Sequence, residues 1–339
     1  MDVDSTHVCQ AFINKVLKLP LTYQGFPGGL PVSLSRDMLP NLHGITNEQT
    51  FVQYTKTFKT DGLRMYLGFT RTRTRRYVFT MDRRGNITQY DPNDFYDDMF
   101  EGTLFDGELK PEQTYFVIDC ACSCGNDVSD KGTYPTRLEV ARYMLAEIAR
   151  QPGCHSLVAT RPSTATYPSN FPDIIVTTVT KWQLKVKVMF YSNADLPQDW
   201  RWDDKEGLVW TLVTSPFHTY KCPRTAIIKW KYQQTIDFFV SKDVSPTELH
   251  VVDDVPTKYQ QGDKGQTKLL VKVSATSPAK WFSTTPDTVS QNGIYECRWD
   301  GEKWAIINLR SDKIWSNNLK TITETVATID KPILFHELV

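Results

Sequence analysis

The sequence of 339 residues lacks an excess of charge of either sign, because 39 lysines and arginines balance 39 aspartates and glutamates. Long-range attraction to polyphosphate needs a net field, so this balance excludes a uniformly basic nucleic-acid coat protein. Any phosphate binding must therefore depend on local clusters of cations. The sequence also lacks an apolar run near the ~18 residues that span a bilayer, and its first residues do not resemble a signal peptide. We therefore expect an intracellular protein, nuclear or cytoplasmic, that does not act at a membrane.

Cysteine is sparse, and its pattern does not indicate a disulfide framework. The seven cysteines are an odd number spread over a long chain, which fits reduced and mostly buried thiols. The cluster Cys120-Ala-Cys122-Ser-Cys124 alternates as a strand does and is expected to place its three thiols on one face. Its Cys-x-Cys spacing differs from the Cys-x2-Cys of zinc sites, and no second ligand pair follows. Packing within a strand is therefore preferred over metal binding.

Segments rich in β-forming residues indicate that strands dominate the first part of the chain. Proline and glycine within the first 45 residues predict a loop that leads into a short strand at 31–34. Further strands, paired antiparallel in sequence order, are predicted at 51–58, 63–70, 77–81, 87–90 and 115–122. Apolar residues at helical spacing then predict a helix over 138–148, with Thr136 and Glu139 ahead as a capping box.

A second series of strands follows a boundary near residues 231–235. Strands at 208–214 and 225–231 lead into it, and it comprises predicted strands at 235–240, 248–252, 268–274, 293–299 and 303–308. A helix is expected at 317–329. Five short strands with polar turns suggest a small closed barrel of the OB type. We therefore predict an α+β protein of antiparallel sheets and helices, with domains at 1–232 and 233–339, the second an OB-fold barrel with a C-terminal helix.

Short polar motifs recur at predicted strand ends. The segment Lys59-Thr60-Asp61-Gly62 sits where a strand would hold side chains rigidly, although by itself it fits a hairpin turn with solvated charges better. This segment continues to Arg64. The segments that follow it are Asp82-Arg83, Asp106-Gly107-Glu108, Tyr115-Phe116-Val117-Ile118-Asp119, Glu206-Gly207-Leu208-Val209, Lys229-Trp230-Lys231 and Arg310-Ser311-Asp312-Lys313. In this order they resemble the six signature motifs of the covalent nucleotidyltransferase superfamily, which contains mRNA capping guanylyltransferases and ATP-dependent ligases.

Within that superfamily the sequence most resembles the compact RNA guanylyltransferases of large DNA viruses. Thr235-Ile236-Asp237-Phe238 follows the Lys-x-Lys pair, Asn317 trails the last motif, and Pro31-Val32-Ser33 precedes the first. The resemblance implies an mRNA 5′ capping enzyme that transfers GMP from GTP, through a covalent lysyl-GMP, to the 5′-diphosphate end of RNA, with release of pyrophosphate. An ATP-dependent polynucleotide ligase and a non-catalytic protein that binds RNA 5′ ends remain alternatives.

Lys59 is the expected nucleophile. An amine attacks phosphorus only when it is unprotonated, so nearby positive charge is required, and Lys229, Lys231 and a divalent cation are expected to supply it. Because Lys229 and Lys231 alternate on a strand, they should point the same way and grip the α-phosphate. Glu206 is the expected ligand of Mg²⁺ or Mn²⁺, since these ions prefer carboxylate oxygens, although it is also compatible with a surface acid.

The resemblance implies roles for further residues around the nucleotide. Arg64 and Glu108 would hold the ribose hydroxyls, and Arg83 would contact the sugar or the phosphates. Asp61 and Gly62 belong to the motif of the nucleophile and complete this part of the nucleotide site.

The guanine site is also implied by resemblance. Tyr115 and Val209 would sandwich the base, Tyr115 and Phe116 could exchange roles, and core packing is an equal alternative for Val209. Lys181 is a looser match to a family lysine that reads guanine.

Arg310, Asp312 and Lys313 lie in the predicted second domain. The resemblance implies that closure of the two domains carries them onto the β- and γ-phosphates, with Asp237 as a hinge residue or closure contact.

The densest basic stretch is Arg71-Thr-Arg73-Thr-Arg75-Arg76. It fits either an RNA phosphate contact or a solvated hairpin tip. The chain is too short to include RNA triphosphatase or cap methyltransferase domains, so these steps are expected from separate partner proteins. If the source is viral, the place of action would be a viral replication site.

Overall fold

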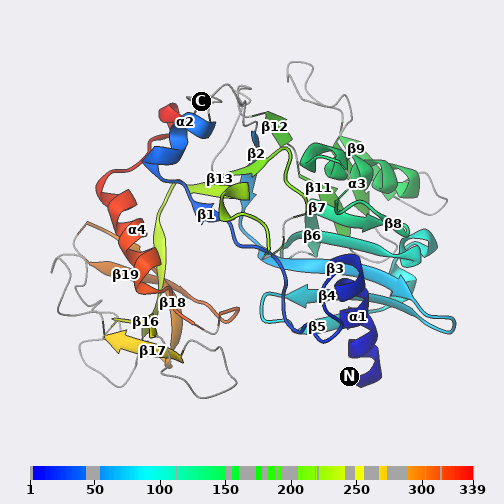
Figure 1. Ribbon diagram of the computed structural model, residues 1–339, viewed down its shortest axis with the longest axis horizontal. Helices are drawn as coiled ribbons and strands as arrows, with labels where there is room; N and C mark the ends of the chain where they lie inside the picture. Colours follow the sequence, from blue (N-terminus) through cyan, green and yellow to red (C-terminus); the bar gives the residue numbers. More distant parts are fainter. Residues whose placement is uncertain are drawn as a thin grey trace. The chain divides into compact units, whose positions relative to one another are not determined.

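The structure is a computed structural model (Figure 1), and the chain divides into two compact units, Met1–Lys231 with Leu338–Val339 and Tyr232–Glu337. It describes residues 3–42, 54–111, 113–130, 132–149, 155–159, 173–177, 182–187, 189–191, 205–217, 219, 221–240, 249–255, 267–272, 289–301, 303–313 and 315–338. The predicted guanine-reading residue Lys181 lies outside these ranges.

The first unit contains two sheets among its described residues. The five-stranded sheet has the order β1 (Val32–Ser33), β14 (Ile227–Lys231), β13 (Lys205–Leu212), β2 (Tyr54–Thr60) and β12 (Met189–Tyr191). The nine-stranded sheet has the order β5 (Ile87–Tyr90), β4 (Arg76–Asp82), β3 (Leu63–Arg71), β6 (Thr103–Leu109), β7 (Thr114–Ser123), β11 (Gln183–Val186), β10 (Asp173–Thr177) and β9 (His155–Ala159), with β8 (Asn126–Asp127) beside β7. Antiparallel pairing dominates, while β1–β14 and β7–β11 are parallel.

The prediction of sequential pairing from the first long strand is wrong for β2. That strand pairs with β13, over a register running from Lys205 opposite Thr60 to Leu212 opposite Tyr54, and with β12 on its other side. Its partners are distant in sequence, so local periodicity could not identify them. The chain crosses from one sheet to the other between β2 and β3, and this crossing brings the end of β2 beside the nine-stranded sheet.

The predicted loop over the first 45 residues is wrong for its first part, which forms helix α1 (Val3–Val16). Cys9, Ile13 and Val16 recur at helical spacing, and all three are buried in a cluster that includes Tyr66 of β3 and Phe79 of β4. The prolines and glycines of this segment follow the helix. Figure 1 shows α1 beside β3, β4 and β5. A short helix, α2 (Leu39–Leu42), follows β1.

The predicted helix after β7 is confirmed as α3 (Tyr134–Ala149), but its capping residue is different. The Thr133 hydroxyl accepts a hydrogen bond from the Thr136 N–H at 3.4 Å, so Thr136 lies inside the first turn and the predicted capping box is wrong. The fully buried Arg137 donates to both carboxylate oxygens of Asp119 on β7, at 2.8 and 2.9 Å. This ion pair ties α3 to the sheet, which assigns the aspartate of that motif a structural contact.

The prediction that the Cys120 cluster places its thiols on one face is wrong because β7 contains a bulge. Cys120 lies opposite Phe105 and Cys122 opposite Leu104, so two residues of β7 span one step of β6. Cys120 consequently packs in the core beneath α3, whereas Cys122 packs in the core beneath α1. The six described cysteines are all free thiols.

The second unit combines one sheet with helix α4 (Leu319–Asp330). Its described strands have the order β17 (Thr267–Lys272), β16 (Leu249–Val255), β15 (Thr235–Val240), β18 (Gly293–Trp299) and β19 (Trp304–Leu309). The buried residues Ile236, Phe238 and Trp304 form its core with Ile322 of the helix. Because β17 and β19 stand at the ends of this order, closure into a barrel stays a prediction. Within the described ranges, no helix is long and apolar enough to cross a bilayer.

Candidate active site

Three lysines share one face of the five-stranded sheet. The register places Gly207 opposite both Lys59 and Lys231, and Val209 opposite Lys229. Directly paired residues of antiparallel strands project to the same side of a sheet. Lys59, Lys229 and Lys231 therefore lie on one face with the half-buried Val209 between their strands. This row combines an amine with further cations, as a reaction at phosphorus requires.

A bulge in β13 directs Glu206 toward this row. The register shifts just before Gly207, whose φ is +154°, and a Cβ there would lie 2.0 Å from the carbonyl oxygen of Trp230, so only glycine fits. Glu206 accepts a hydrogen bond from Lys59 Nζ and lies 3.5 Å from Lys231 Nζ. Burial alone would raise the pKa of Glu206, but Lys59 and Lys231 outweigh it and lower the pKa to about 2. The carboxylate is therefore ionised at neutral pH.

A second row of side chains crosses the nine-stranded sheet. Arg64 on β3 lies opposite Glu108 on β6, Glu108 opposite Phe116 on β7, and Phe116 opposite Lys185 on β11. These four side chains share one face. The Phe116 ring has Lys185 Nζ 5.7 Å from its centroid and Lys110 Nζ at 5.8 Å. The face thus combines the Phe116 ring with the cationic side chains Arg64, Lys110 and Lys185 and with the carboxylate of Glu108.

Glu108 connects the two sheets. Its carboxylate accepts from the Thr60 hydroxyl and from Lys187 Nζ at 2.7 Å, and Lys187 Nζ also donates to the Phe58 carbonyl at 3.4 Å. Burial would raise the pKa of Glu108, but Lys187 and Lys59 outweigh it, and the net shift is downward. Burial lowers the pKa of Lys187, and Glu108 opposes that shift only in part. The two groups form a buried ion pair on the nine-stranded sheet, and their bonds to Thr60 and Phe58 of β2 link that sheet to the five-stranded one.

Lys187 was missed by the sequence-based reasoning. It follows Lys185 at the spacing of two that also marks Lys229 and Lys231, so the Lys-x-Lys pattern was a usable signal. The pattern alone could not separate the half-buried Lys185 from Lys187, whose side chain is 6% exposed.

Arg64 is held firmly on its face. Its Nε and Nη2 donate to the two oxygens of Asp106 at 3.0 and 2.6 Å, and its Nη1 donates to the Gly29 carbonyl at 2.5 Å. The guanidinium also lies over the Phe26 ring, 5.7 Å from the centroid. Three of its five N–H donors are thus used within the protein. The fork is preorganised, and its predicted contact with the ribose stays a prediction.

The placement of Tyr115 contradicts its predicted role as a stacking surface. Its side chain is fully buried in the core beneath α3, and its hydroxyl donates to the carbonyls of Met65 at 2.9 Å and Phe105 at 3.2 Å. The next residue, Phe116, points to the opposite face because side chains alternate along a strand. Phe116 is therefore the aromatic side chain of this pair that a base could reach.

Other predicted residues lie in turns at the same ends of the strands. Asp61 is exposed between β2 and β3, and it contributes to the lowered pKa of Glu206. Gly62 packs tightly, since a Cβ there would lie 3.2 Å from the Leu109 carbonyl oxygen. Arg83 is exposed in the turn after β4, where the Asp82 carboxylate accepts from backbone N–H groups of the turn.

The last motif forms a separate network within the second unit. Arg310 donates from Nε and Nη2 to Asp312, both at 2.8 Å, and from Nη1 to Asp237 at 3.1 Å, while Lys313 also donates to Asp237. The Asp237 N–H donates to Asn317 Oδ1 at 2.7 Å. Bonding to Asp312 raises the pKa of Arg310, and the same bond lowers the pKa of Asp312. Asp237 therefore holds both cations of the motif within their own unit.

The donor set around Glu206 fits a divalent cation held jointly with a substrate. No group of three or more His, Cys, Asp or Glu side chains with metal-binding geometry occurs among the described residues. The ionised Glu206, with its side chain 28% exposed, offers one carboxylate. Mg²⁺ commonly binds one or two carboxylates and completes its shell with water and substrate phosphates. Glu206 therefore supplies the one carboxylate that such a shared Mg²⁺ site needs from the protein.

Comparison with known proteins assigns the whole chain to one family. The model of the mRNA capping enzyme catalytic domain matches residues 2–233, and that of the mRNA capping enzyme C-terminal domain matches residues 232–339. The mRNA-capping enzyme subunit alpha of Neurospora crassa is 24% identical over 359 residues, covering 93% of this chain and 83% of the relative.

Similar solved structures include mycobacterial DNA ligase D complexed with ATP and MES, at 14% identity and a TM-score of 0.37 over 76% of this chain and 90% of that one. A Lig E DNA ligase has 13% identity and a TM-score of 0.35, over 85% of this chain and 100% of that one. Because both domain models together match the chain from residue 2 to residue 339, the protein belongs to the mRNA capping enzyme family.

Proposed function

We propose that the chain transfers GMP from GTP to the 5′-diphosphate end of RNA through a covalent intermediate on Lys59. As a member of its family, the chain is an mRNA guanylyltransferase. The observation that supports Lys59 as the nucleophile is its position, bonded to Glu206 and on one face with Lys229 and Lys231. These residues surround one amine with the charges that a phosphoryl transfer needs.

The first step forms a bond between Lys59 Nζ and the α-phosphorus of GTP and breaks the bond to the bridging oxygen, so that pyrophosphate leaves. Lys229 and Lys231 would stabilise the charge that develops on the α-phosphate oxygens. In the second step, a terminal oxygen of the RNA 5′ diphosphate attacks the same phosphorus. The N–P bond breaks, the amine of Lys59 is regenerated, and a GpppN cap is formed.

We propose Glu206 as the residue that would hold Mg²⁺ or Mn²⁺. When bound, such a cation neutralises charge on the phosphate oxygens of the substrate. The hydrogen bond between Glu206 and Lys59 is compatible with this role, because it keeps the carboxylate beside the reacting amine.

The nucleoside would lie against the face that carries Phe116. We propose that the Phe116 ring stacks on guanine with Val209 opposite, and that Glu108 and Arg64 contact the ribose, with Arg83 near the sugar or phosphates. The pair of Glu108 and Lys187 supports this arrangement, because it fixes an ionised acceptor between the sheets.

We further propose that residues 1–232 form the catalytic domain and residues 233–339 a lid. Closure of the lid would carry Arg310, Asp312 and Lys313 to the β- and γ-phosphates and would be reversed before RNA enters. Asp237 would act as a positioning residue, since it already binds both cations of the motif.

The finer assignments of partner, place and source are also proposals. A 5′-diphosphate end must be generated by an RNA triphosphatase, and the capped end is the substrate of a methyltransferase, so we propose separate proteins for both steps. The fungal relative is named as a subunit, which fits such a division. We retain the resemblance to compact viral enzymes as a proposal, with action in the nucleus, the cytoplasm or a viral replication site.

Mass analysis after incubation with GTP or ATP and Mg²⁺ tests the proposed function. We expect a GMP adduct on the Lys59 peptide of the unaltered protein, no adduct in Lys59→Arg, and a normal adduct in the control Lys320→Arg, which alters an exposed lysine of α4. Adenylate without guanylate would instead indicate a ligase. Binding of RNA 5′ ends without any adduct would indicate a non-catalytic protein.

A further inference from the structure

We propose that the tip of the β3–β4 hairpin, residues 71–76, is a second phosphate-binding site that holds the RNA substrate several nucleotides downstream of its 5′ end. The inference rests on the proposed function, because the RNA must be held at Lys59 by its 5′ diphosphate. The tip contains four arginines within six residues of a chain whose total charge balances to zero. Attraction to polyphosphate must therefore be local, and this segment has the required density of cations.

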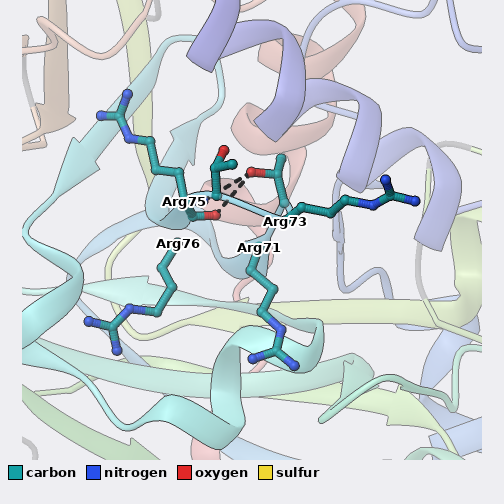
Figure 2. Close-up of a pocket in the computed structure, with 6 residues that line it drawn as sticks. Arg71, Arg73, Arg75 and Arg76 are labelled. Carbon is teal, nitrogen blue, oxygen red and sulfur yellow. Dashed lines mark hydrogen bonds between the residues drawn. The ribbon is translucent and has the colours of Figure 1, made fainter.

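The hairpin provides a defined scaffold for these arginines. The Thr72 N–H donates to the Arg75 carbonyl at 2.8 Å, and the Arg75 N–H donates to Thr72 Oγ1 at 3.2 Å (Figure 2). Arg71 and Arg76 close the strand pair directly beneath this turn. The backbone of the tip is thus ordered before any ligand binds, which reduces the entropic cost of binding.

The arginine side chains diverge from the turn. Figure 2 shows Arg71, Arg73, Arg75 and Arg76 pointing in separate directions. Four cations that converged would fit a single phosphate or a mononucleotide. Cations that diverge instead match a flexible chain that presents one phosphate after another, as single-stranded RNA does. The geometry therefore favours a polymer over a small anion.

Two of the guanidinium groups are braced by aromatic rings. Arg75 lies over Tyr77, and Arg76 over Phe100, each 5.2 Å from the ring centroid. Stacking restricts the rotation of a long side chain while its edge can still donate in a fork to phosphate oxygens. The edge of Arg76 donates to Asp97 at 2.7 Å and to Asn93 Oδ1 at 2.9 Å, so phosphate would have to replace these two acceptors. These two arginines are consequently prepared for phosphate binding at a lower cost in side-chain entropy.

The acidic neighbours of the tip do not neutralise it permanently. Arg71 pairs with Glu101, and Arg76 pairs with Asp97 at 2.7 Å. Both pairs are exposed, and exposed ion pairs contribute only about 0–1 kcal/mol, so several RNA phosphates can replace the carboxylates. Arg73 and Arg75 form no ion pair with any described residue. Removal of these two cations should therefore weaken the binding of RNA most directly.

The tip lies too far from the nucleotide site to act on GTP. Arg64 and Arg71 are both on β3 and seven residues apart, a separation of ~23 Å at ~3.3 Å per residue. Arg64 belongs to the nucleotide face, so the tip marks the opposite end of the strand. A dinucleotide cannot reach both places, whereas a longer RNA can. Dependence on RNA length is therefore the distinguishing property of this site.

Guanylyl transfer from preformed enzyme–GMP to 5′-diphosphate RNA tests the proposal. The acceptors are a dinucleotide and an RNA of about 20 nucleotides, and the variants are Arg73→Gln with Arg75→Gln and, as control, Lys320→Gln. Two lost contacts to single-stranded RNA should reduce the salt slope of long-RNA binding by about 1.4. This corresponds to a loss of up to about 25-fold at about 0.1 M salt, shrinking to about 3-fold at about 0.5 M.

We expect the double variant to lose affinity for the long RNA alone, while adduct formation and transfer to the dinucleotide match the control. An unchanged salt slope with long RNA, or an equal loss with both acceptors, would overturn the proposal. The proposal would also be overturned if binding of a phosphorylated acidic peptide required the two arginines and binding of long RNA did not. Absence of any GMP adduct in the unaltered protein would instead reject the proposed function, so the two failures are distinguishable.

Discussion

Replacing Lys187 by methionine is expected to destabilise the first unit and to reveal the cost of an uncompensated buried carboxylate. Lys187 and Glu108 have side chains only 6% and 13% exposed, and Nζ lies 2.7 Å from the carboxylate. Methionine preserves the length of the side chain but removes its charge and its donors. Glu108 would then keep the Thr60 hydroxyl and the more distant positive charge of Lys59.

The expected loss is about 3–5 kcal/mol, the usual cost of breaking a buried ion pair by removing one partner. For a domain of roughly 150–250 residues, each kcal/mol shifts the melting temperature by about 2–4 °C. Lys187→Met should therefore lower the melting temperature by about 6–20 °C. The control Lys185→Met, two residues away on β11 and half-buried, should change stability by less than about 0.5 kcal/mol.

The loss should also depend on pH with a definite sign. In the unaltered protein the pKa of Glu108 is lowered, so its contribution to stability is present above the ordinary pKa and is lost as the pH falls through the folded value. Without Lys187, burial dominates and should raise the pKa of Glu108. The free energy of unfolding of the variant is therefore lowest at high pH, where Glu108 is ionised, and it recovers as the carboxyl becomes protonated. The difference in stability between the unaltered protein and Lys187→Met should therefore narrow as the pH falls from about 8 to about 5.

Thermal and urea unfolding of Lys187→Met, Glu108→Gln and the double variant measure these quantities. We expect the double variant to be clearly more stable than the sum of the two single losses predicts, because it contains no unpaired buried charge. Additive losses, or a difference that widens on acidification, would refute the assignment of a coupled buried pair between the two sheets.

Three further predictions concern the proposed nucleotide site. Phe116→Ala should raise the KM for GTP by about 5- to 150-fold, from a stacking energy of about 1–3 kcal/mol. Tyr115→Phe should alter stability and leave that KM unchanged. If steady-state assays gave the same KM for Phe116→Ala and Tyr115→Phe, this assignment would be contradicted. Glu206→Gln should raise the Mg²⁺ concentration needed for adduct formation, and its stability difference from the unaltered protein should shrink below about pH 4.5, since a carboxylate with a lowered pKa loses its contribution as it is protonated. Asp237→Asn should slow adduct formation in single-turnover assays without slowing GMP transfer from the isolated intermediate, because Arg310 would be less well positioned; a slowed second step alone would count against this role.

Much of the strand content followed from local sequence, because alternation of apolar and polar residues reports directly on a pleated backbone. β18 was predicted with its observed bounds, and α3 and α4 near theirs. The pattern failed where the local rule was broken. The bulge at Cys120 reversed the expected faces of β7. The loop predicted for the first 45 residues extended the proline and glycine of residues 25–31 over α1, whose apolar residues stand at helical spacing.

The sequence by itself determined the order of the motifs, and the resemblance of that order to the covalent nucleotidyltransferases indicated the chemistry without any knowledge of where the strands lie. The tertiary structure alone decided which of these side chains meet. It brought Glu206 to Lys59 through a bulge that requires Gly207, and it turned Phe116 rather than Tyr115 toward the face that carries Arg64 and Glu108. Sheet pairing joins residues far apart in the chain, and a shift of one residue reverses every face, so neither outcome is encoded in a local pattern.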